Sequence, residues 1–205
     1  PFQLEEQKET TACLTFGKKV RSVEVRIGLS ALSSELASWE CARWEKMDFE
    51  EVKSRTADQW EKQLSAIDVK GGKKDDRVIF NTSLYRTYLS PADVSSPDGA
   101  YLGTDGKVYI SEDFRYYSNW SLWDTFRTKF PLLVLTEPAK MRDMATSLIH
   151  LYATGKKDWS TGFESTPTVR TEHAVILLLD AYRKGITNLD FRKGYAGMKQ
   201  EMERL

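Results

Sequence analysis

The chain has 205 residues, enough for one large domain or parts of two. Its 30 lysines and arginines balance its 30 aspartates and glutamates, so its net charge gives no general attraction for nucleic acid or an anionic membrane. No apolar run approaches the roughly 20 residues of a membrane-spanning helix. Two cysteines are too few for a disulfide framework or a zinc site.

The first predicted elements are two strands between residues 11 and 29. TACLTF and VEVRIGLS alternate small or apolar residues with polar ones, and Gly17-Lys18-Lys19 lies between them as a turn. An isolated hairpin is only marginally stable, so we expect these strands to belong to a sheet that this chain does not complete.

Two helices are predicted next. Residues 31–44 (ALSSELASWECARW) place their apolar side chains at helical spacing. Asp48 is the predicted N-cap of the second helix, whose apolar positions recur on one face as far as Ile67. We interpret this pair as a connection between the sheet and the later part of the chain.

A third helix is predicted from Asp75-Asp76 to Pro91, where the proline ends it. The two aspartates lack the regular oxygen spacing of a calcium loop, so helix capping explains them better. Residues 95–109 (SSPDGAYLGTDGKVY) are rich in turn dipeptides and predict a surface hairpin between helices.

Residues 116–135 (YYSNWSLWDTFRTKFPLLVL) form the most aromatic segment of the chain. We predict a helix there that buries most of the rings, with Asp124 near its beginning. Position alone favours Asp124 as a solvated charge that the helix dipole stabilises, and a role in a site is the alternative.

Three further helices are predicted. One begins at Pro138, one runs from Val169 to Tyr182 and is apolar almost all round, and one follows Asp190 as its cap. The succession of helices from residue 76 onward is typical of an array of helical hairpins or a toroid.

Four segments in this order resemble glycoside hydrolase family 92, a family of calcium-dependent exo-α-mannosidases. They are NTSLYRTYLSP, SPDGAYLGTDGKVY, YYSNWSLWDTFRTKFPLLVL and the stretch from Trp159 into EHAVILLLDAYRKGI. SLWDTF followed by FPLL carries the resemblance most strongly. It implies a mainly α chain: part of an (α/α)6 toroid, preceded by linker helices and the last strands of an N-terminal β-sandwich.

The resemblance also implies domain boundaries and a location. Residues 1–30 would end the sandwich domain, residues 31–74 would form the linker, and residues 75–205 would begin the catalytic toroid. The chain ends inside a predicted helix and has no leader pattern, so we expect it to be a piece of a longer polypeptide. The resemblance implies that this polypeptide is secreted or periplasmic.

The chemistry implied by the resemblance is hydrolysis of terminal α-linked mannose, of the α-1,2 type, with inversion and with the help of Ca²⁺. An inverting glycosidase uses a general acid and a general base that lie roughly 6.5–9.5 Å apart. The resemblance makes Glu164 the general acid and Asp124 a ligand of the sugar. Trp120, Trp123 and Trp159 would line the substrate pocket, although core packing explains tryptophans equally well.

The position of the acid remains open at the level of sequence. Counting back from His173 places the family's acid on Ser165, and a one-residue difference in loop length restores Glu164. A serine at that position would leave the acid missing, with Glu172 as a helix charge away from the site. The family's base and most calcium ligands belong to a later Asp-rich motif that these residues do not contain, so the chain alone is expected to be inactive.

Three functions follow as hypotheses. The first is a fragment of an α-mannosidase that degrades mannose-terminated glycans, with the rest of the parent polypeptide as its partner. The second is a relative that binds mannosides without hydrolysis or with altered specificity, such as for a mannose phosphate. The third is a helical scaffold, which the incomplete strands of residues 11–29 argue against.

Overall fold

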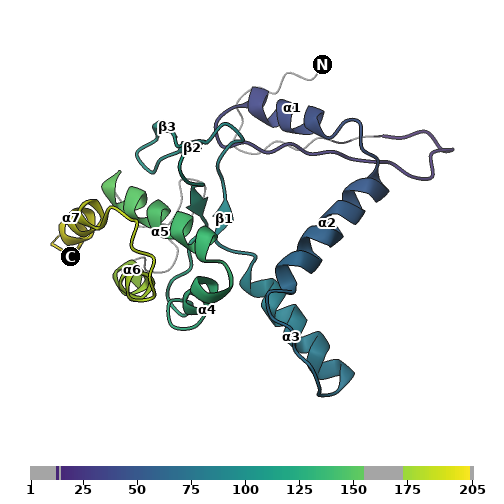
Figure 1. The fold of residues 1–205 in the computed structure, drawn as a ribbon. Coiled ribbons are helices and arrows are strands. Elements are labelled where there is room, and N and C mark those ends of the chain that lie inside the picture. Colours follow the sequence, from purple (N-terminus) through teal and green to yellow (C-terminus); the bar gives the residue numbers. More distant parts are fainter. Residues whose placement is uncertain (1–12, 14, 155–172, 204–205) are drawn as a thin grey trace.

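The computed structural model describes residue 13, residues 15–154 and residues 173–203 (Figure 1). Within these residues the fold is mainly helical, as predicted. The helices are α1 (Ser34–Arg43), α2 (Phe49–Leu64), α3 (Lys74–Thr87), α4 (Lys129–Thr136), α5 (Pro138–Ala153), α6 (Ala174–Arg183) and α7 (Phe191–Met202). The strands are β1 (Ala92–Asp93), β2 (Ala100–Leu102), β3 (Val108–Ile110) and β4 (Tyr117–Ser118).

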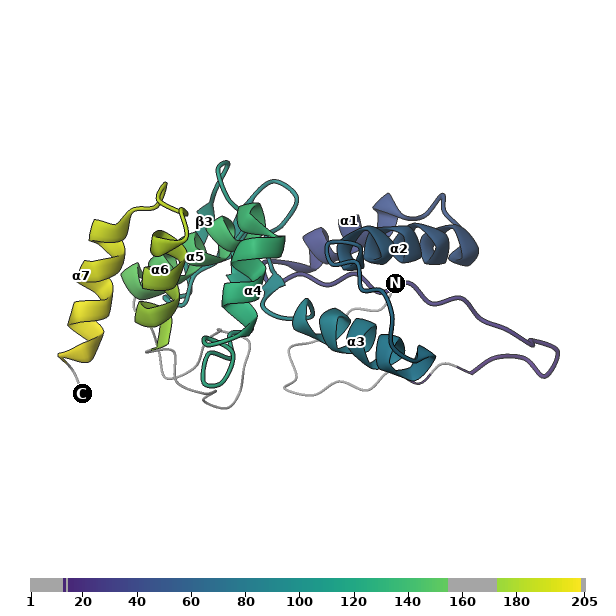
Figure 2. The ribbon, with the colours of Figure 1, turned by 60° about the horizontal axis from the view of Figure 1, so that its bottom comes forward.

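The hydrophobic core of the described residues is built around α5. Its buried residues come mainly from α4, α5, α6 and the segment that precedes α4, and α7 packs along the other side of α5. Figures 1 and 2 show these four helices gathered at one end of the molecule, with α1, α2 and α3 extending away from them. The apolar residues of α5 face this core, and the buried ones are Met141, Met144, Ala145, Leu148, Ile149, Leu151 and Tyr152.

Two glycines allow α7 to approach α5 closely. A methyl group built on Gly194 would lie 2.9 Å from Cγ1 of Ile149, and one built on Gly197 would lie 3.0 Å from Cβ of Tyr152. The glycine face of α7 therefore meets the core, whereas Tyr195 is 66 % exposed. Tyr195 lies away from α5 because glycine, which has no side chain, allows the backbones of the two helices to approach closely.

Two short antiparallel sheets complete the fold of the described residues. β1 pairs with β4, and Asp93 lies opposite Tyr117. β2 pairs with β3, and Tyr101 lies opposite Tyr109. The second pair confirms the predicted hairpin, whose turn contains Gly106 with a φ of 81°.

The strand β2 is fixed to α5 through its central residue, Tyr101, which is only 2 % exposed. Its ring stacks on Tyr116 at 4.1 Å between centroids, and its hydroxyl lies 2.9 Å from Nδ1 of His150. The other ring nitrogen of His150 lies 3.5 Å from Nζ of Lys193 on α7. His150 thus connects the hairpin, α5 and α7.

The predicted strands of residues 11–29 are not formed in the described part of that segment. The turn at Gly17 is present, with the Val20 N–H donating to the Gly17 carbonyl at 2.9 Å. The apolar side chains of the second run remain 48–82 % exposed. A strand needs a partner for its backbone groups, and none of the residues described here supplies one. Whether residues 1–30 end a β-sandwich stays a prediction.

The helices α1, α2 and α3 form where the sequence predicts them. The Asp48 carboxylate accepts the Glu51 N–H at 2.9 Å, as expected of an N-cap, and the Asp76 carboxylate accepts the Lys73 N–H at 3.0 Å. No residue of α1 or α2 is buried. Their helical form therefore rests on local signals, and their role as a linker remains a prediction.

Two helix predictions need correction. The aromatic segment 116–135 becomes helical only at Lys129, because Tyr117 and Ser118 form β4 and pair with β1, and Asn119 follows with a φ of 63°. The helix predicted to be buried on several sides, α6, buries only one face. Val175, Ile176, Leu179 and Tyr182 are 42–50 % exposed because no described element covers them.

A search of the described helices finds none with the length and apolar character needed to cross a bilayer.

His150 gives the first testable prediction. Burial, and then the Lys193 ammonium group, lower the pKa of His150 below 6.5, while Asp190 opposes the shift. The unfolded chain therefore takes up a proton before the folded chain does, and the contribution of His150 to stability is lost as the pH falls below about 6.5. We expect an NMR titration to place the His150 midpoint below 6.5.

The matching control is His150→Gln, which also identifies the His150 signal by its absence. This variant should lose less stability than the wild type between pH 7.5 and pH 5.0 in urea unfolding. A midpoint for His150 at or above 6.5 would contradict the prediction.

Candidate functional site

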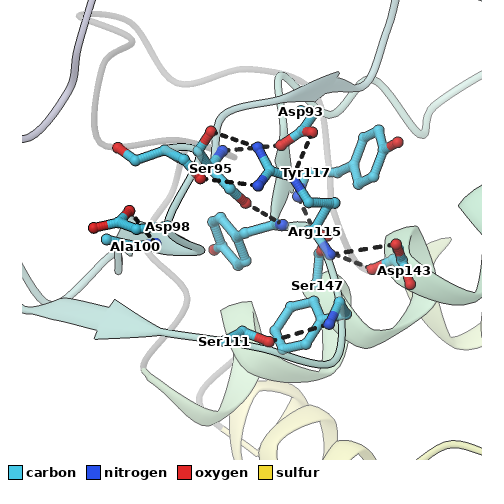
Figure 3. Close-up of polar contacts among 12 residues, drawn as sticks. Asp93, Ser95, Asp98, Ala100, Ser111, Arg115, Tyr117, Asp143 and Ser147 are labelled. Carbon is cyan, nitrogen blue, oxygen red and sulfur yellow. Dashed lines mark hydrogen bonds and ion pairs between the residues drawn. The ribbon is translucent and has the colours of Figure 1, made fainter. Parts of the chain in front are cut away.

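A polar network around Arg115 places the strand that leads into the aromatic segment (Figure 3). The Arg115 guanidinium donates to the Asp93 carboxylate at 2.8 Å and to the carbonyls of Ser95 and Ser96 at 2.7 and 2.8 Å. The Arg115 N–H reaches the Asp143 carboxylate on α5 at 3.3 Å. One arginine therefore joins β1, the following loop and β4 to α5.

The Ser147 hydroxyl continues this connection from α5. Ser147 is fully buried, accepts the Tyr117 N–H at 2.9 Å and donates to the Asp143 carbonyl at 2.7 Å. A buried hydroxyl with both functions satisfied fixes its partners, because breaking either bond would leave an unpaired polar group inside the core. The strand β4 is held in this way where it enters the aromatic segment.

Residues 119–128, called here the aromatic loop, follow β4 and end at α4. Trp120 and Leu122 point into the core and are 2 % and 0 % exposed. Between these buried side chains and α4 the chain turns outward, so that Trp123 is 48 % exposed and Asp124 is exposed. The Phe126 N–H donates to the Leu122 carbonyl at 3.4 Å and closes the turn. The loop thus exposes the side chains of Trp123 and Asp124, while Trp120 and Leu122 anchor its backbone in the core.

The beginning of α6 lies against the aromatic loop. The His173 ring stacks on Phe126, with centroids 4.6 Å apart, and meets the Trp123 ring edge-on at 6.3 Å. Figure 2 shows the segment before α4 and the beginning of α6 at the same end of the helices. Two parts of the chain that are far apart in sequence therefore meet beside Asp124.

Lys129, at the beginning of α4, is a second charged residue close to Asp124. Its ammonium group donates to the Ser90 hydroxyl at 2.9 Å and lies 5.8 Å from the centroid of Phe130. Burial lowers the pKa of Lys129 to about 8, and the Asp124 carboxylate acts in the opposite direction. A partly desolvated cation therefore lies within electrostatic reach of the exposed carboxylate.

The structure separates the predicted site residues into three groups. Asp124 and Trp123 lie together on the exposed side of the aromatic loop, whereas Trp120 lies in the core, 6.1 Å from Phe130 between ring centroids. Glu164 and Trp159 lie outside the described residues, as do Ser165 and Glu172. The roles given to all these residues remain predictions.

His173, Phe126 and Lys129 are the residues of this corner that the sequence did not single out for a site. His173 lies at least 45 residues from the loop that it contacts, and no local pattern reports such a contact. For Lys129, the sequence offered one signal of an unusual environment: it is a charged residue at the beginning of an apolar helix.

The comparisons with known proteins agree on one family. A sequence model of the glycosyl hydrolase family 92 catalytic domain matches residues 36–204. A search of curated proteins found no significant match.

Solved structures of the same family are similar to this chain. The family 92 glycosyl hydrolase ccman5 is 31 % identical, with a TM-score of 0.72 over 82 % of this chain and 23 % of its own. The α-mannosidase BT3965 from Bacteroides thetaiotaomicron is 28 % identical, with a TM-score of 0.74 over 83 % of this chain and 23 % of its own. It has also been solved in complex with mannoimidazole.

A third structure is the inverting mannosidase BT2199 from Bacteroides thetaiotaomicron VPI-5482. It is 26 % identical, with a TM-score of 0.71 over 82 % of this chain and 23 % of its own. The chain therefore spans 23 % of the length of each of these solved relatives.

The environment of Lys129 gives a prediction that needs no substrate. After reductive methylation with ¹³C-formaldehyde, the Lys129 signal should titrate near pH 8, whereas exposed lysines should titrate at about 10.4. The variant Lys129→Arg identifies the signal. If the signal that disappears in this variant titrates with the exposed lysines, the ammonium group is not desolvated as described.

Proposed function

The chain belongs to glycosyl hydrolase family 92, and we propose that the full-length protein removes terminal α-linked mannose from glycans. The observation that carries the proposal is that the carboxylate of Asp124 and the indole of Trp123, neighbours in the sequence, are both exposed on the aromatic loop in a chain of this family. The solved relatives include an α-mannosidase and an inverting mannosidase, which supports mannose as the sugar and inversion as the outcome.

The chemistry of Asp124 and Trp123 suits a sugar. A carboxylate accepts hydrogen bonds from two neighbouring hydroxyl groups, and such charge-assisted bonds are short and strong. An indole face covers the apolar C–H groups of a pyranose ring. Small-molecule sites typically combine aromatic walls with a few placed polar groups, and the aromatic loop supplies one of each.

The proposed hydrolysis requires a second and a third carboxyl group. We assign the general acid to Glu164, which would protonate the leaving oxygen. The base that activates water on the opposite face would come from a part of the protein outside this chain. The chain therefore contributes a sugar ligand and the acid, and the isolated chain is expected to be inactive.

Calcium enters the proposal through the family, and the described residues alone do not fit a calcium site. They contain no group of three or more His, Cys, Asp and Glu side chains arranged to hold a metal. Asp124 also lies within reach of the Lys129 cation, which disfavours a second cation there. When bound, Ca²⁺ would coordinate sugar hydroxyl oxygens, with its protein ligands supplied mainly by the rest of the polypeptide.

The remaining parts of the proposal concern the whole protein. Residues 1–30 would end a β-sandwich, residues 31–74 would link the domains, and residues 75–205 would begin the (α/α)6 toroid. Preference for α-1,2 linkages, roles for Trp120 and Trp159 in the pocket, and a secreted or periplasmic location are proposed on the family alone.

A second function is kept because of one observation in the sequence. The family's acid position falls on Ser165 when it is counted from His173, one residue after Glu164. If Ser165 fills that position, the protein would bind mannosides without hydrolysing them or would act on a substrate with a better leaving group, such as a mannose phosphate.

Mannose release by the full-length protein tests the proposal. We expect terminal mannose to be released from an α-1,2-linked mannobiose, activity to disappear in EDTA, and excess Ca²⁺ to restore it. Activity that survives complete removal of calcium would remove the metal from the proposal. No release from any α-mannoside would remove the hydrolase.

Two substitutions then separate the carboxylates. Glu164→Gln should lower kcat by about 100-fold or more if Glu164 is the acid. Asp124→Ala should lower kcat/KM by about 10- to 100-fold, because a hydrogen bond to a charged group contributes about 1.5–3 kcal/mol. Glu112→Gln, at an exposed carboxylate in the loop after β3, is the matched control and should leave the rates unchanged. An unchanged rate in Glu164→Gln would exclude Glu164 as the acid.

A further inference from the structure

His173, at the beginning of α6, contacts two rings in the outer part of the aromatic loop. Its ring lies 4.6 Å from Phe126 at an interplanar angle of 30° and 6.3 Å from Trp123 at 68°. The imidazole is therefore stacked on the Phe126 ring and in an edge-to-face arrangement with the Trp123 ring. These are the two geometries in which aromatic rings attract each other.

The two rings that His173 touches lie on either side of Asp124 in the sequence. Trp123 precedes the carboxylate directly, and Phe126 follows it by two residues. The backbone between the two rings is short, so holding both of them leaves Asp124 little freedom to turn. A loop held in this way presents its carboxylate in one orientation before a ligand arrives.

The hydrogen-bonding state of His173 shows how it acts on the loop. Its Nδ1 is buried and has no hydrogen-bond partner among the described residues. The described contacts of the ring with the aromatic loop are therefore packing contacts. A phenylalanine at this position could reproduce the contacts, whereas an alanine could not.

Other contacts hold the two ends of this loop. Trp120 and Leu122 hold its entrance in the core, and Lys129 holds its exit at Ser90. Phe126 also lies beside the guanidinium of Arg127, at 5.3 Å, within the same loop. Between the two ends, His173 joins the loop to α6.

We propose that His173 is a positioning residue of the sugar site, whose ring packs on Phe126 and Trp123 and thereby fixes the orientation of Asp124. The inference rests on the proposed function, because it takes Asp124 as the carboxylate that binds the sugar. It adds a residue from α6 that acts through the aromatic loop and does not touch the substrate itself.

The test compares three variants of the full-length protein on the α-1,2-linked mannobiose. His173→Ala should raise KM about tenfold and change kcat less than threefold, because it weakens sugar binding and leaves the acid in place. His173→Phe keeps the ring and should restore KM to within about threefold of the wild type. His150→Phe is the matched control at the other described histidine, and KM should not change.

A double-mutant cycle shows whether His173 acts through Asp124. In an Asp124→Ala background, His173→Ala should raise KM no further, because the group that it positions is already gone. Independent, multiplying effects of the two substitutions would overturn the proposal. It would also be overturned if His173→Ala left KM unchanged in an active enzyme, or if His173→Phe were as impaired as His173→Ala.

A spectroscopic readout keeps this inference separate from the proposed function. In protein labelled with 5-fluorotryptophan, the Trp123 signal, identified by its loss in Trp123→Phe, should shift in His173→Ala and remain in place in His150→Phe. If the Trp123 signal shifts in His173→Ala but the wild type releases no mannose, the proposed function is refuted and the contact between His173 and Trp123 is still established. If the wild type is active but the Trp123 signal does not shift in His173→Ala, the role of His173 is refuted.

Discussion

The burial of α5 is the constraint on which the rest of the described structure depends. The helix packs against α4, α6 and α7, and eight of its residues are buried. It also carries the polar groups that hold β4, since Ser147 and Asp143 bind the backbone around Arg115. The same helix therefore builds the core and sets the point from which the aromatic loop begins. A helix surrounded in this way tolerates little displacement, because interiors are close-packed.

The contrast between the two ends of the molecule follows from this constraint. The helices α1 and α2 have caps and ion pairs of their own but bury no side chain, whereas α4 to α7 share one core. Surface ion pairs of the kind seen along α2 contribute little to stability. The candidate site lies with the shared core, where a loop can be held from below by Trp120 and Leu122 while its outer residues face solvent.

Local signals in the sequence predicted the elements that are formed by local interactions. Asp48 and Asp190 cap helices as expected, and the turn at Gly106 closes the predicted hairpin. The prediction failed where a distant partner decides the outcome. Tyr117 pairs with Asp93 of β1, 24 residues away, and its N–H group binds the Ser147 hydroxyl, 30 residues away, so this part of the segment is extended and not helical. At the site, the sequence pointed to Asp124 and Trp123 only through a family resemblance, and it did not reveal the contact of His173, which exists only after α6 has packed.

The surroundings of Asp124 favour one of its two chemical roles over the other. A general acid of a glycosidase is kept protonated by an apolar pocket or by a neighbouring carboxylate. Asp124 has neither among the described residues: it is exposed, and the charge within its reach is the Lys129 ammonium group. An ionised carboxylate is an acceptor of hydrogen bonds from hydroxyl groups. The exposed position of Asp124 therefore agrees with the role of sugar ligand that we propose for it, whereas the proposed acid is a different residue, Glu164.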